Sequence, residues 1–218
     1  MSITTMILGE SGTGKTTSLR NLDPENTLLI QAVRKPLPFK SHNWKPFSKE
    51  HPTGNIFITD NAVEIVRIIR KTRRKIVVID DFQYIMANEF MRRSNERGFD
   101  KFTEIGRNAW DIINAASSLA DDVRVYILSH VETSEHGKTK IKTIGKMLDK
   151  KITLEGMVTI VLRTVVNDGQ YLFSTRNNGH DTTKTPMGLF DSDLINNDLA
   201  EVDASIFSYY ELSEEQAA

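Results

Sequence analysis

Strand-length runs of apolar residues recur along the chain and form its main pattern. They occupy residues 3–8, 27–32, 55–59, 76–79 and 123–128. In the run at 76–79 every position is apolar and β-branched, so both faces of the strand must be covered. Such a run is typical of a central strand in a parallel sheet between two layers of helices.

The segments between these runs have helical patterns. Asn61, followed three residues later by Glu64, predicts a capping box at a helix start, and the basic residues 70–75 suit the C-terminal end of that helix. Residues 82–120 predict two helices that break near Gly98. Alternating strands and helices predict an α/β fold with a mainly parallel sheet and helices on both faces.

The C-terminal part of the chain departs from this alternation. Residues 157–166 and 171–174 predict two strands, and the Asn-Asp-Gly sequence at 167–169 predicts a hairpin turn between them. We therefore expect a C-terminal β-hairpin at one edge of the sheet. A single domain is expected over residues 1–210, followed by a disordered acidic tail at 211–218.

Composition excludes several classes of protein. The chain has 218 residues, a net charge of −1 and no cysteine, which excludes disulfides, thiol catalysis and cysteine zinc sites. With so little net charge, any nucleic-acid binding must come from a local patch. The sequence predicts neither a signal peptide nor a membrane span, so a cytoplasmic location is expected.

The most specific motif is Gly-Glu-Ser-Gly-Thr-Gly-Lys-Thr at residues 9–16, which matches the phosphate-binding loop G-x-x-x-x-G-K-[ST]. A strand, this loop and a helix in succession direct backbone N–H groups and the helix dipole at an anion. Lys15 is expected to reach the β- and γ-phosphates, and to face solvent when no nucleotide is bound; the Thr16 hydroxyl is expected to bind Mg²⁺. The residues expected to bind nucleotide are Gly9, Glu10, Ser11, Gly12, Thr13, Gly14, Lys15, Thr16 and Thr17.

Three polar side chains lie where neighbouring strands are predicted to end. Asp80 follows the run at 76–79 and is the expected magnesium carboxylate, with a helix N-cap as the alternative. Asp81 is either such a cap or the general base. His130 ends the next strand, where it can contact the γ-phosphate or the attacking water.

With these features the chain resembles the RecA-like recombination ATPases in their shortened phage form, and among them the phage single-strand annealing ATPases of the Sak-four type. The resemblance spans about residues 1–190. It implies a RecA-like P-loop NTPase that binds ATP, Mg²⁺ and single-stranded DNA, forms a homo-oligomeric ring or filament, and assists annealing with a single-strand-binding protein. It rests on the phosphate loop, the strand at 75–81, Gly-Arg-Asn-Ala-Trp at 106–110, Ser129-His130 and Lys184-Thr185-Pro186.

The chain departs from the RecA-like pattern after its second strand, where those enzymes usually carry a catalytic glutamate. Residues 29–34 contain no carboxylate. Asp81, Glu104 and Glu132 are therefore alternatives for the general base. Otherwise hydrolysis is slow, and ATP acts mainly as a conformational ligand.

A lysine-rich segment after His130 is the expected DNA contact. Lysines on a mobile loop suit contacts to phosphates that do not depend on base sequence, and the loops after this strand face DNA in RecA-like filaments, so the resemblance agrees. The alternative is a solvated charged loop. The residues concerned are Lys138, Lys140, Lys142 and Lys146.

One of two cations after the predicted hairpin, Arg176 or Lys184, is expected to act on the nucleotide of a neighbouring subunit. The alternative is that Arg176 pairs with a surface carboxylate and Lys184 is solvated. The resemblance to ring ATPases supports the first interpretation.

Two other functions would use the same phosphate loop. A small-molecule kinase needs an arginine-rich lid, for which the dense candidates are Arg92, Arg93 and Arg97. A hexameric helicase-type motor usually carries further domains. The lysine-rich segment favours a DNA-binding ATPase over a kinase, and the length of the chain argues against a motor.

Overall fold

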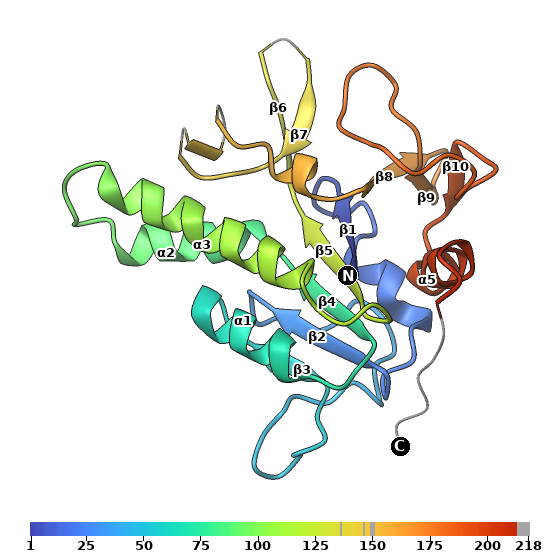
Figure 1. The fold of residues 1–218 in the computed structure, drawn as a ribbon, viewed down its shortest axis with the longest axis horizontal. Coiled ribbons are helices and arrows are strands. Elements are labelled where there is room, and N and C mark those ends of the chain that lie inside the picture. Colours follow the sequence, from blue (N-terminus) through green and yellow to red (C-terminus); the bar gives the residue numbers. More distant parts are fainter. Residues whose placement is uncertain (136, 146, 149–150, 213–218) are drawn as a thin grey trace.

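The chain folds around one large sheet, as the computed structural model shows for residues 1–135, 137–145, 147–148 and 151–212 (Figure 1). Within these residues the sheet has eight strands: β1 (Ile3–Leu8), β2 (Thr27–Gln31), β3 (Ile56–Ile58), β4 (Ile76–Asp80), β5 (Arg124–Ser129), β8 (Ile160–Asn167), β9 (Gln170–Ser174) and β10 (Leu194–Asn196). Their order is β10-β9-β8-β1-β5-β4-β2-β3. The strands from β8 to β3 are parallel, whereas β9 and β10 are each antiparallel to the preceding neighbour. The predicted α/β fold with a mainly parallel sheet is confirmed.

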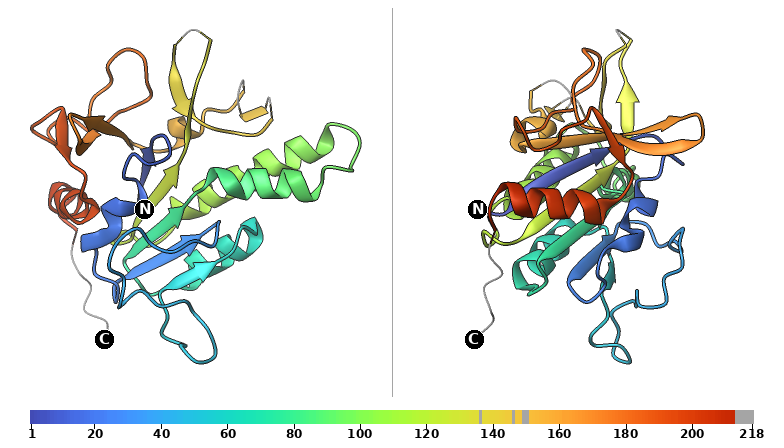
Figure 2. Two further views of the ribbon diagram at one scale, coloured as in Figure 1. Left: turned by 180° about the vertical axis from the view of Figure 1, so that it is seen from behind. Right: turned by 90° about the vertical axis from the view of Figure 1, so that its right-hand side faces the viewer.

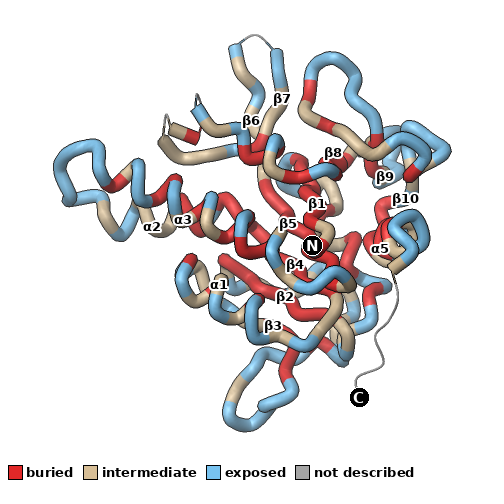
Figure 3. Tube along the Cα trace, viewed as in Figure 1, coloured by how far each residue is buried: buried red, intermediate tan, exposed pale blue. Residues whose placement is uncertain are grey.

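Helices cover both faces of the sheet, as predicted. On one face lie α1 (Ala62–Lys71), α2 (Gln83–Arg92) and α3 (Asp100–Ala116); on the other lie the 3₁₀ helix η1 (Thr16–Asn21) and α5 (Leu199–Tyr209) (Figure 2). Successive strand residues supply opposite cores, so Val77 packs with the α1–α3 side and Val78 with the α5 side. The central strands are therefore buried on both faces (Figure 3), which agrees with the wholly apolar run at 76–79.

The helix boundaries follow local sequence signals. Asn61 caps α1 by accepting a hydrogen bond from the Glu64 amide at 3.0 Å, which confirms the predicted helix start. The Glu64 carboxylate accepts from the Thr59 hydroxyl instead of completing the capping box. The predicted break between α2 and α3 is also confirmed, and Gly98 lies in it with a φ of 92°.

The predicted hairpin is confirmed, but its place at the sheet edge is wrong. Strands β8 and β9 pair around Asp168 and Gly169, whose φ values of 48° and 78° lie in the left-handed region that a tight hairpin turn requires. Beyond the hairpin, β10 pairs with β9 and forms the edge, and α5 follows. The sequence analysis did not predict either element. Strand β10 has only three residues and lies between aspartates and asparagines, which weaken a strand pattern.

Part of the lysine-rich segment forms a β-hairpin where a loop was predicted. Strands β6 (Val131–Thr133) and β7 (Thr139–Ile141) form a separate antiparallel hairpin that extends from the end of β5, and a short 3₁₀ helix, η2 (Leu154–Met157), follows. Lys146 and residues 213–218 of the predicted tail lie outside the described residues. Among the helices that the structure describes, none is both long and apolar enough to cross a lipid bilayer.

Candidate functional site

A cavity of about 660 Å³ lies beside the phosphate loop. Residues at the carboxyl ends of parallel strands meet here, because β5 lies between β1 and β4 in the sheet. The structure therefore brings the predicted loop together with Asp80, Asp81 and His130. Residues that line the cavity include Ser11, Gly12, Gly14, Lys15, Thr16, Thr17, Lys35, Asp81, His130, Tyr171 and Asn197.

The phosphate loop is packed against strand β8, which explains its first glycine. A Cβ atom at Gly9 would lie 1.7 Å from the Thr164 Oγ1 atom, so no larger residue fits without moving β8. The Thr13 and Thr164 hydroxyl oxygens are 2.6 Å apart, within hydrogen-bond distance. Gly14 has a φ of 95°, which other residues rarely adopt. Contact with β8 and the backbone conformation at Gly14 therefore both restrict the shape of the loop.

Lys15 is buried, so the expectation that its side chain faces solvent is wrong. Its ammonium group donates to the carbonyl oxygens of Gly9 at 2.8 Å and Glu10 at 2.7 Å. Burial lowers the pKa of Lys15 to about 8, although the carboxylates of Asp80 and Asp81 oppose the shift. Two backbone carbonyl oxygens of the loop therefore hold the Lys15 ammonium group beside the cavity.

Asp80 and Thr16 place two oxygen donors together beside the loop. The Thr16 hydroxyl donates to the Asp80 carboxylate, with distances of 3.0 and 3.2 Å to its two oxygens. Asp80 is completely buried, and burial, assisted by the charge of Asp81, raises its pKa to about 6. Its carboxylate also accepts from the Asp81 amide, but the N-cap residue of α2 is Phe82, so Asp80 does not cap that helix.

This pair of donors fits Mg²⁺, which prefers oxygen ligands and commonly takes one or two from the protein, with the rest from phosphates and water. Within the described residues no group of three or more histidine, cysteine or carboxylate side chains could hold a metal ion. A resident all-protein metal cage is therefore not present in that part of the chain, whereas a phosphate-assisted site at Thr16 and Asp80 remains compatible with the geometry.

Asp81 faces the cavity between two basic side chains. One carboxylate oxygen lies 2.5 Å from the Lys35 ammonium, and the other lies 3.9 Å from His130 Nε2. The side chain does not cap α2, which excludes the alternative of a purely capping role. Its φ of 61° is unusual for a residue with a side chain, and such backbone conformations often occur at functional sites.

Lys35 was not predicted, because it belongs to no motif. Lys35 follows β2, the strand after which RecA-like enzymes usually carry a catalytic glutamate. A basic side chain is therefore present in the region where those enzymes have an acidic one. The hydrogen bond to Asp81 and the nearby carboxylates raise the pKa of Lys35, although burial opposes this.

His130 is held in place by Gln83, a second residue that the sequence analysis missed. The His130 amide donates to Gln83 Oε1 at 3.1 Å, and the Ser129 hydroxyl donates to the same atom at 3.3 Å. Gln83 is buried in the first turn of α2. Burial, together with the positive charge of Lys15, lowers the pKa of His130, so its imidazole is neutral at physiological pH.

The opposite wall of the cavity comes from the C-terminal elements. A Cβ atom on Gly14 would lie 3.0 Å from both Tyr171 and Asn197. Arg20 donates to the Asn197 backbone carbonyl at 2.6 Å, whereas the Asn197 Nδ2 atom is buried and has no hydrogen-bond partner among the described residues. Tyr171 and Asn197 belong to no sequence motif, so the sequence did not predict their place in the site. The nearest sequence signal is the helix N-cap residue Asp198, whose side chain accepts a hydrogen bond from the Ala200 amide.

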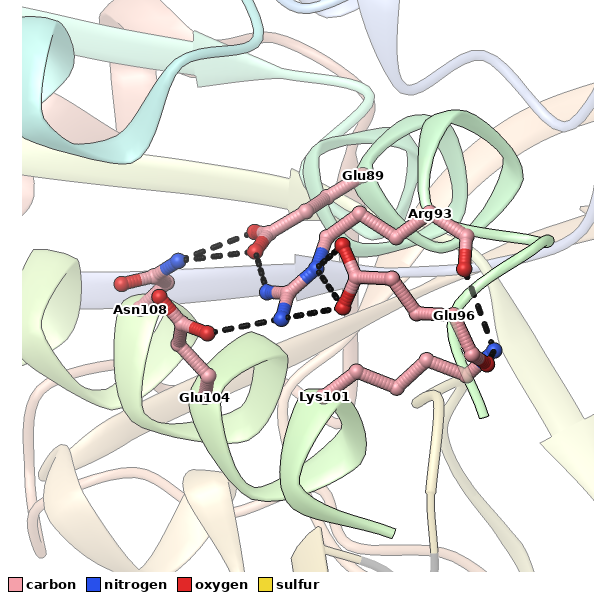
Figure 4. Close-up of polar contacts among 6 residues, drawn as sticks. All are labelled: Glu89, Arg93, Glu96, Lys101, Glu104 and Asn108. Carbon is pink, nitrogen blue, oxygen red and sulfur yellow. Dashed lines mark hydrogen bonds and ion pairs between the residues drawn. The ribbon is translucent and has the colours of Figure 1, made fainter. Parts of the chain in front are cut away.

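The other two candidates for the general base lie elsewhere. Glu104 projects from α3 and forms an ion pair with Arg93 at 2.8 Å, within the polar cluster of α2 and α3 that Figure 4 shows. Arg93 also pairs with Glu89 and Glu96. Because these acids already hold Arg93, the cluster links the two helices and does not form a free lid.

Glu132 lies on β6, 3.4 Å from the Lys140 ammonium on β7. Neither Glu104 nor Glu132 lines the cavity at the phosphate loop. Of the three predicted alternatives, the structure therefore brings Asp81 alone to that cavity.

The remaining predicted residues occupy two other regions. Arg176 forms an exposed ion pair with Asp193 at 2.7 Å, and Arg176 and Lys184 both line a separate cavity of about 350 Å³. Lys138 and Lys142 are exposed at the β6–β7 hairpin, and Lys140 is partly buried there. The Lys142 amide donates to the His130 carbonyl at 2.9 Å, which connects this hairpin to the site.

Comparisons with known proteins give little guidance. No protein-family model matches the chain. A curated protein with detectable similarity is sorting nexin-4 of Komagataella pastoris, 23% identical over 180 residues, with 76% of this chain and 27% of that protein covered. The chain thus spans about a quarter of the length of the relative it matches. Such a similarity assigns the chain to no family and transfers no site residue to it.

Proposed function

We propose that the protein is a RecA-like P-loop ATPase that binds single-stranded DNA and promotes strand annealing as a homo-oligomer. The observation that carries this proposal is the contact of Thr16 with Asp80. A buried carboxylate at the end of β4 lies 3.0 Å from the hydroxyl of the phosphate loop, and Lys15 is near enough to interact electrostatically with that carboxylate. A nearby cation stabilises the ionised form of a buried carboxylate, and Mg²⁺ with a nucleotide would supply one.

Each residue of the site has a distinct role in this proposal. Lys15 would leave the carbonyls of Gly9 and Glu10 for the phosphates of ATP, while Thr16 and Asp80 would hold Mg²⁺. When bound, Mg²⁺ neutralises charge on the phosphate oxygens. Asp81 would accept the proton of the attacking water, and His130 would contact the γ-phosphate.

Lys35 is a constraint on this mechanism, because it forms an ion pair with the proposed base. The pair occupies the carboxylate that would accept the proton of the attacking water. The γ-phosphate is a competing anion for Lys35, so binding of ATP would free Asp81 to act as the base.

The β6–β7 hairpin supports the DNA-binding part of the proposal. Its exposed lysines, Lys138 and Lys142, suit contacts to phosphates that do not depend on base sequence. Its backbone is bonded to His130, so a shift of that residue on nucleotide binding would reach the hairpin directly. The annealing activity, the homo-oligomer and a single-strand-binding protein as partner come from the resemblance.

The rate of ATP hydrolysis, measured with and without single-stranded DNA, tests the proposal. DNA should increase the rate in the wild-type protein and have no effect in Lys15→Ala, which should lose ATP binding. Lys138→Ala/Lys142→Ala should retain basal hydrolysis and lose the stimulation. Arg97→Ala/Arg107→Ala, which removes two exposed cations from the helical region, is the matched control. Hydrolysis that responds to a small phosphoryl acceptor and ignores DNA would instead identify a kinase.

A further inference from the structure

The basic run at residues 70–75 takes no part in the site described above. It lies at the end of α1, where four arginine and lysine side chains are exposed: Arg67, Arg70, Lys71 and Arg73. Among the described residues, Glu64, 3.5 Å from Arg67, is the one carboxylate that pairs with any of the four. The patch therefore has uncompensated positive charge, although the whole chain has a net charge of −1.

An aromatic pair lies beside this patch. The rings of Phe47 and Phe57 are stacked, with centroids 4.6 Å apart and planes inclined by 16°. Phe47 is 50% exposed although it is large and apolar. The two rings line a groove of about 320 Å³ together with Leu28, Ile68, Arg67, Lys71 and Arg74.

Arg74 gives the groove a fixed shape. Its guanidinium donates to the carbonyl oxygens of Glu25, Thr53 and Gly54 at 3.2, 2.8 and 3.2 Å. These bonds join the segment that follows Phe47 to the end of α1. No carboxylate among the described residues pairs with Arg74, so its charge adds to that of the patch. The groove is thus preformed and cationic.

The groove lies at the end of the sheet opposite the phosphate loop. Leu28 is near the amino end of β2, and α1 ends beside it, whereas the nucleotide cavity lies at the carboxyl ends of the strands. Phe57, which lines the groove, lies on β3, and in Figure 1 β3 and the β6–β7 hairpin lie in opposite parts of the molecule. A ligand in the groove would therefore not compete with one at the phosphate loop or the lysine hairpin.

We propose that this groove is a second binding site for single-stranded nucleic acid. A base stacks on the exposed ring of Phe47, and phosphates contact Arg70, Lys71 and Arg73. A nucleobase fits the observations better than an acidic peptide does, because stacked aromatic rings offer a planar face that suits any base, and the neighbouring cations suit a repeating phosphate backbone. The proposal adds a contact to the DNA binding proposed above and does not depend on the nucleotide site.

Fluorescence anisotropy with a labelled oligothymidylate and an abasic oligonucleotide of equal length tests the stacking. The measurement uses the full chain, in the wild-type and Lys138→Ala/Lys142→Ala backgrounds, without ATP. Phe47→Leu keeps an apolar side chain and removes the ring. It should weaken binding of oligothymidylate about tenfold and leave the abasic affinity unchanged, since stacking contributes roughly that factor per base.

A second variant tests the proposed contacts between the basic side chains and the phosphates. Arg70→Gln/Arg73→Gln should weaken both oligonucleotides and flatten the salt dependence by about 0.7 for each phosphate that the variant no longer binds. Arg97→Gln/Arg107→Gln is the matched control, and should change neither. Thermal unfolding of each variant verifies that it is folded.

Two results would overturn the proposal. The first is unchanged affinity and salt dependence in both groove variants; if Lys138→Ala/Lys142→Ala still abolished binding, the DNA-binding function would stand and the second site would not. The second is selective binding of a glutamate-rich peptide with a terminal phenylalanine, abolished in Phe47→Leu and not displaced by oligothymidylate. That result would assign the groove to a protein partner.

Discussion

At the scale of single residues, the candidate site contains ionisable groups whose charged forms are less stable than they would be in water. Burial lowers the pKa of Lys15 to about 8 and raises that of Asp80 to about 6. Such perturbed groups beside a cavity are characteristic of functional sites. They also make the site measurable by its response to pH.

Lys15 should make nucleotide affinity fall in mild alkali. Only the protonated amine attracts phosphate, so the dissociation constant for ATP should rise about tenfold for each pH unit above 8. Below pH 7 the affinity should be independent of this group. Calorimetric titration between pH 6.5 and 9.5 measures the effect. Lys15→Arg, whose side chain stays protonated, should bind with a flat profile; a flat profile in the wild-type protein would contradict the assigned pKa.

Asp80→Asn should stabilise the protein and impair its use of Mg²⁺. Because the pKa of Asp80 is raised on folding, the ionised carboxylate destabilises the folded state as the pH rises from about 4 through 6. The variant should therefore gain on the order of 3 kcal/mol above pH 6, and nothing near pH 4. Urea denaturation at pH 4 and pH 7.5 checks this. Magnesium-dependent hydrolysis should be lost, and wild-type turnover in the variant would rule out Asp80 as a ligand.

At the scale of secondary-structure elements, the chain is predictable where local pattern and tertiary burial agree. The predicted bounds of β1 to β5 hold within one residue at each end. Four of these strands, β1, β2, β4 and β5, are buried on both faces, which gives them a strong apolar pattern. The grouping of the phosphate loop with Asp80, Asp81 and His130 at one end of the sheet was likewise predicted, since each is adjacent to such a strand.

Lys35, Gln83, Tyr171 and Asn197 were not found, because each enters the site from a separate element that only tertiary packing brings there. The capping residue Asp198 and the apolar spacing of Leu199, Val202 and Ile206 were signals for α5 that the sequence analysis passed over. This helix is anchored by a buried cluster: Arg124 on β5 makes two hydrogen bonds to Asp203, at 3.0 and 2.8 Å, and the Tyr126 hydroxyl donates to the same carboxylate at 2.5 Å.

Asp203→Ala should lower the free energy of unfolding by about 3 kcal/mol or more, because it leaves a buried guanidinium without its partner. Asp193→Ala breaks the exposed ion pair with Arg176 and should cost less than about 1 kcal/mol. Chemical denaturation compares the two. If their costs are equal, the buried cluster does not hold α5 on the sheet.

At the scale of the whole molecule, the cations of the chain are divided among separate surfaces. Arg176 and Lys184 line a cavity of their own, apart from the phosphate loop of the same chain. If either contacts a γ-phosphate, that phosphate would belong to another subunit. Arg176 would first have to leave its exposed ion pair with Asp193.

Mixing variants tests this arrangement between subunits. Lys15→Ala and Arg176→Ala should each be inactive alone, and an equimolar mixture should recover part of the hydrolysis, because some interfaces then combine an intact loop with an intact arginine. Activity per subunit of the wild-type protein should rise with concentration as subunits associate. If the mixture is no more active than its components, and specific activity does not change with concentration, Arg176 and Lys184 do not act on a neighbouring subunit.

The cavity at the phosphate loop has a consequence for how the protein is made. One wall comes from residues near the start of the chain and the other from Asn197 and its neighbours, which are joined to Arg20 across 177 positions. At ordinary rates of translation, these walls leave the ribosome about 10–35 s apart. During that interval a nascent chain carries a phosphate loop without its facing wall. Nucleotide capture, and any assembly on DNA that depends on it, would thus await synthesis of Asn197 and its neighbours, so that nascent chains lacking this segment stay out of the working complex.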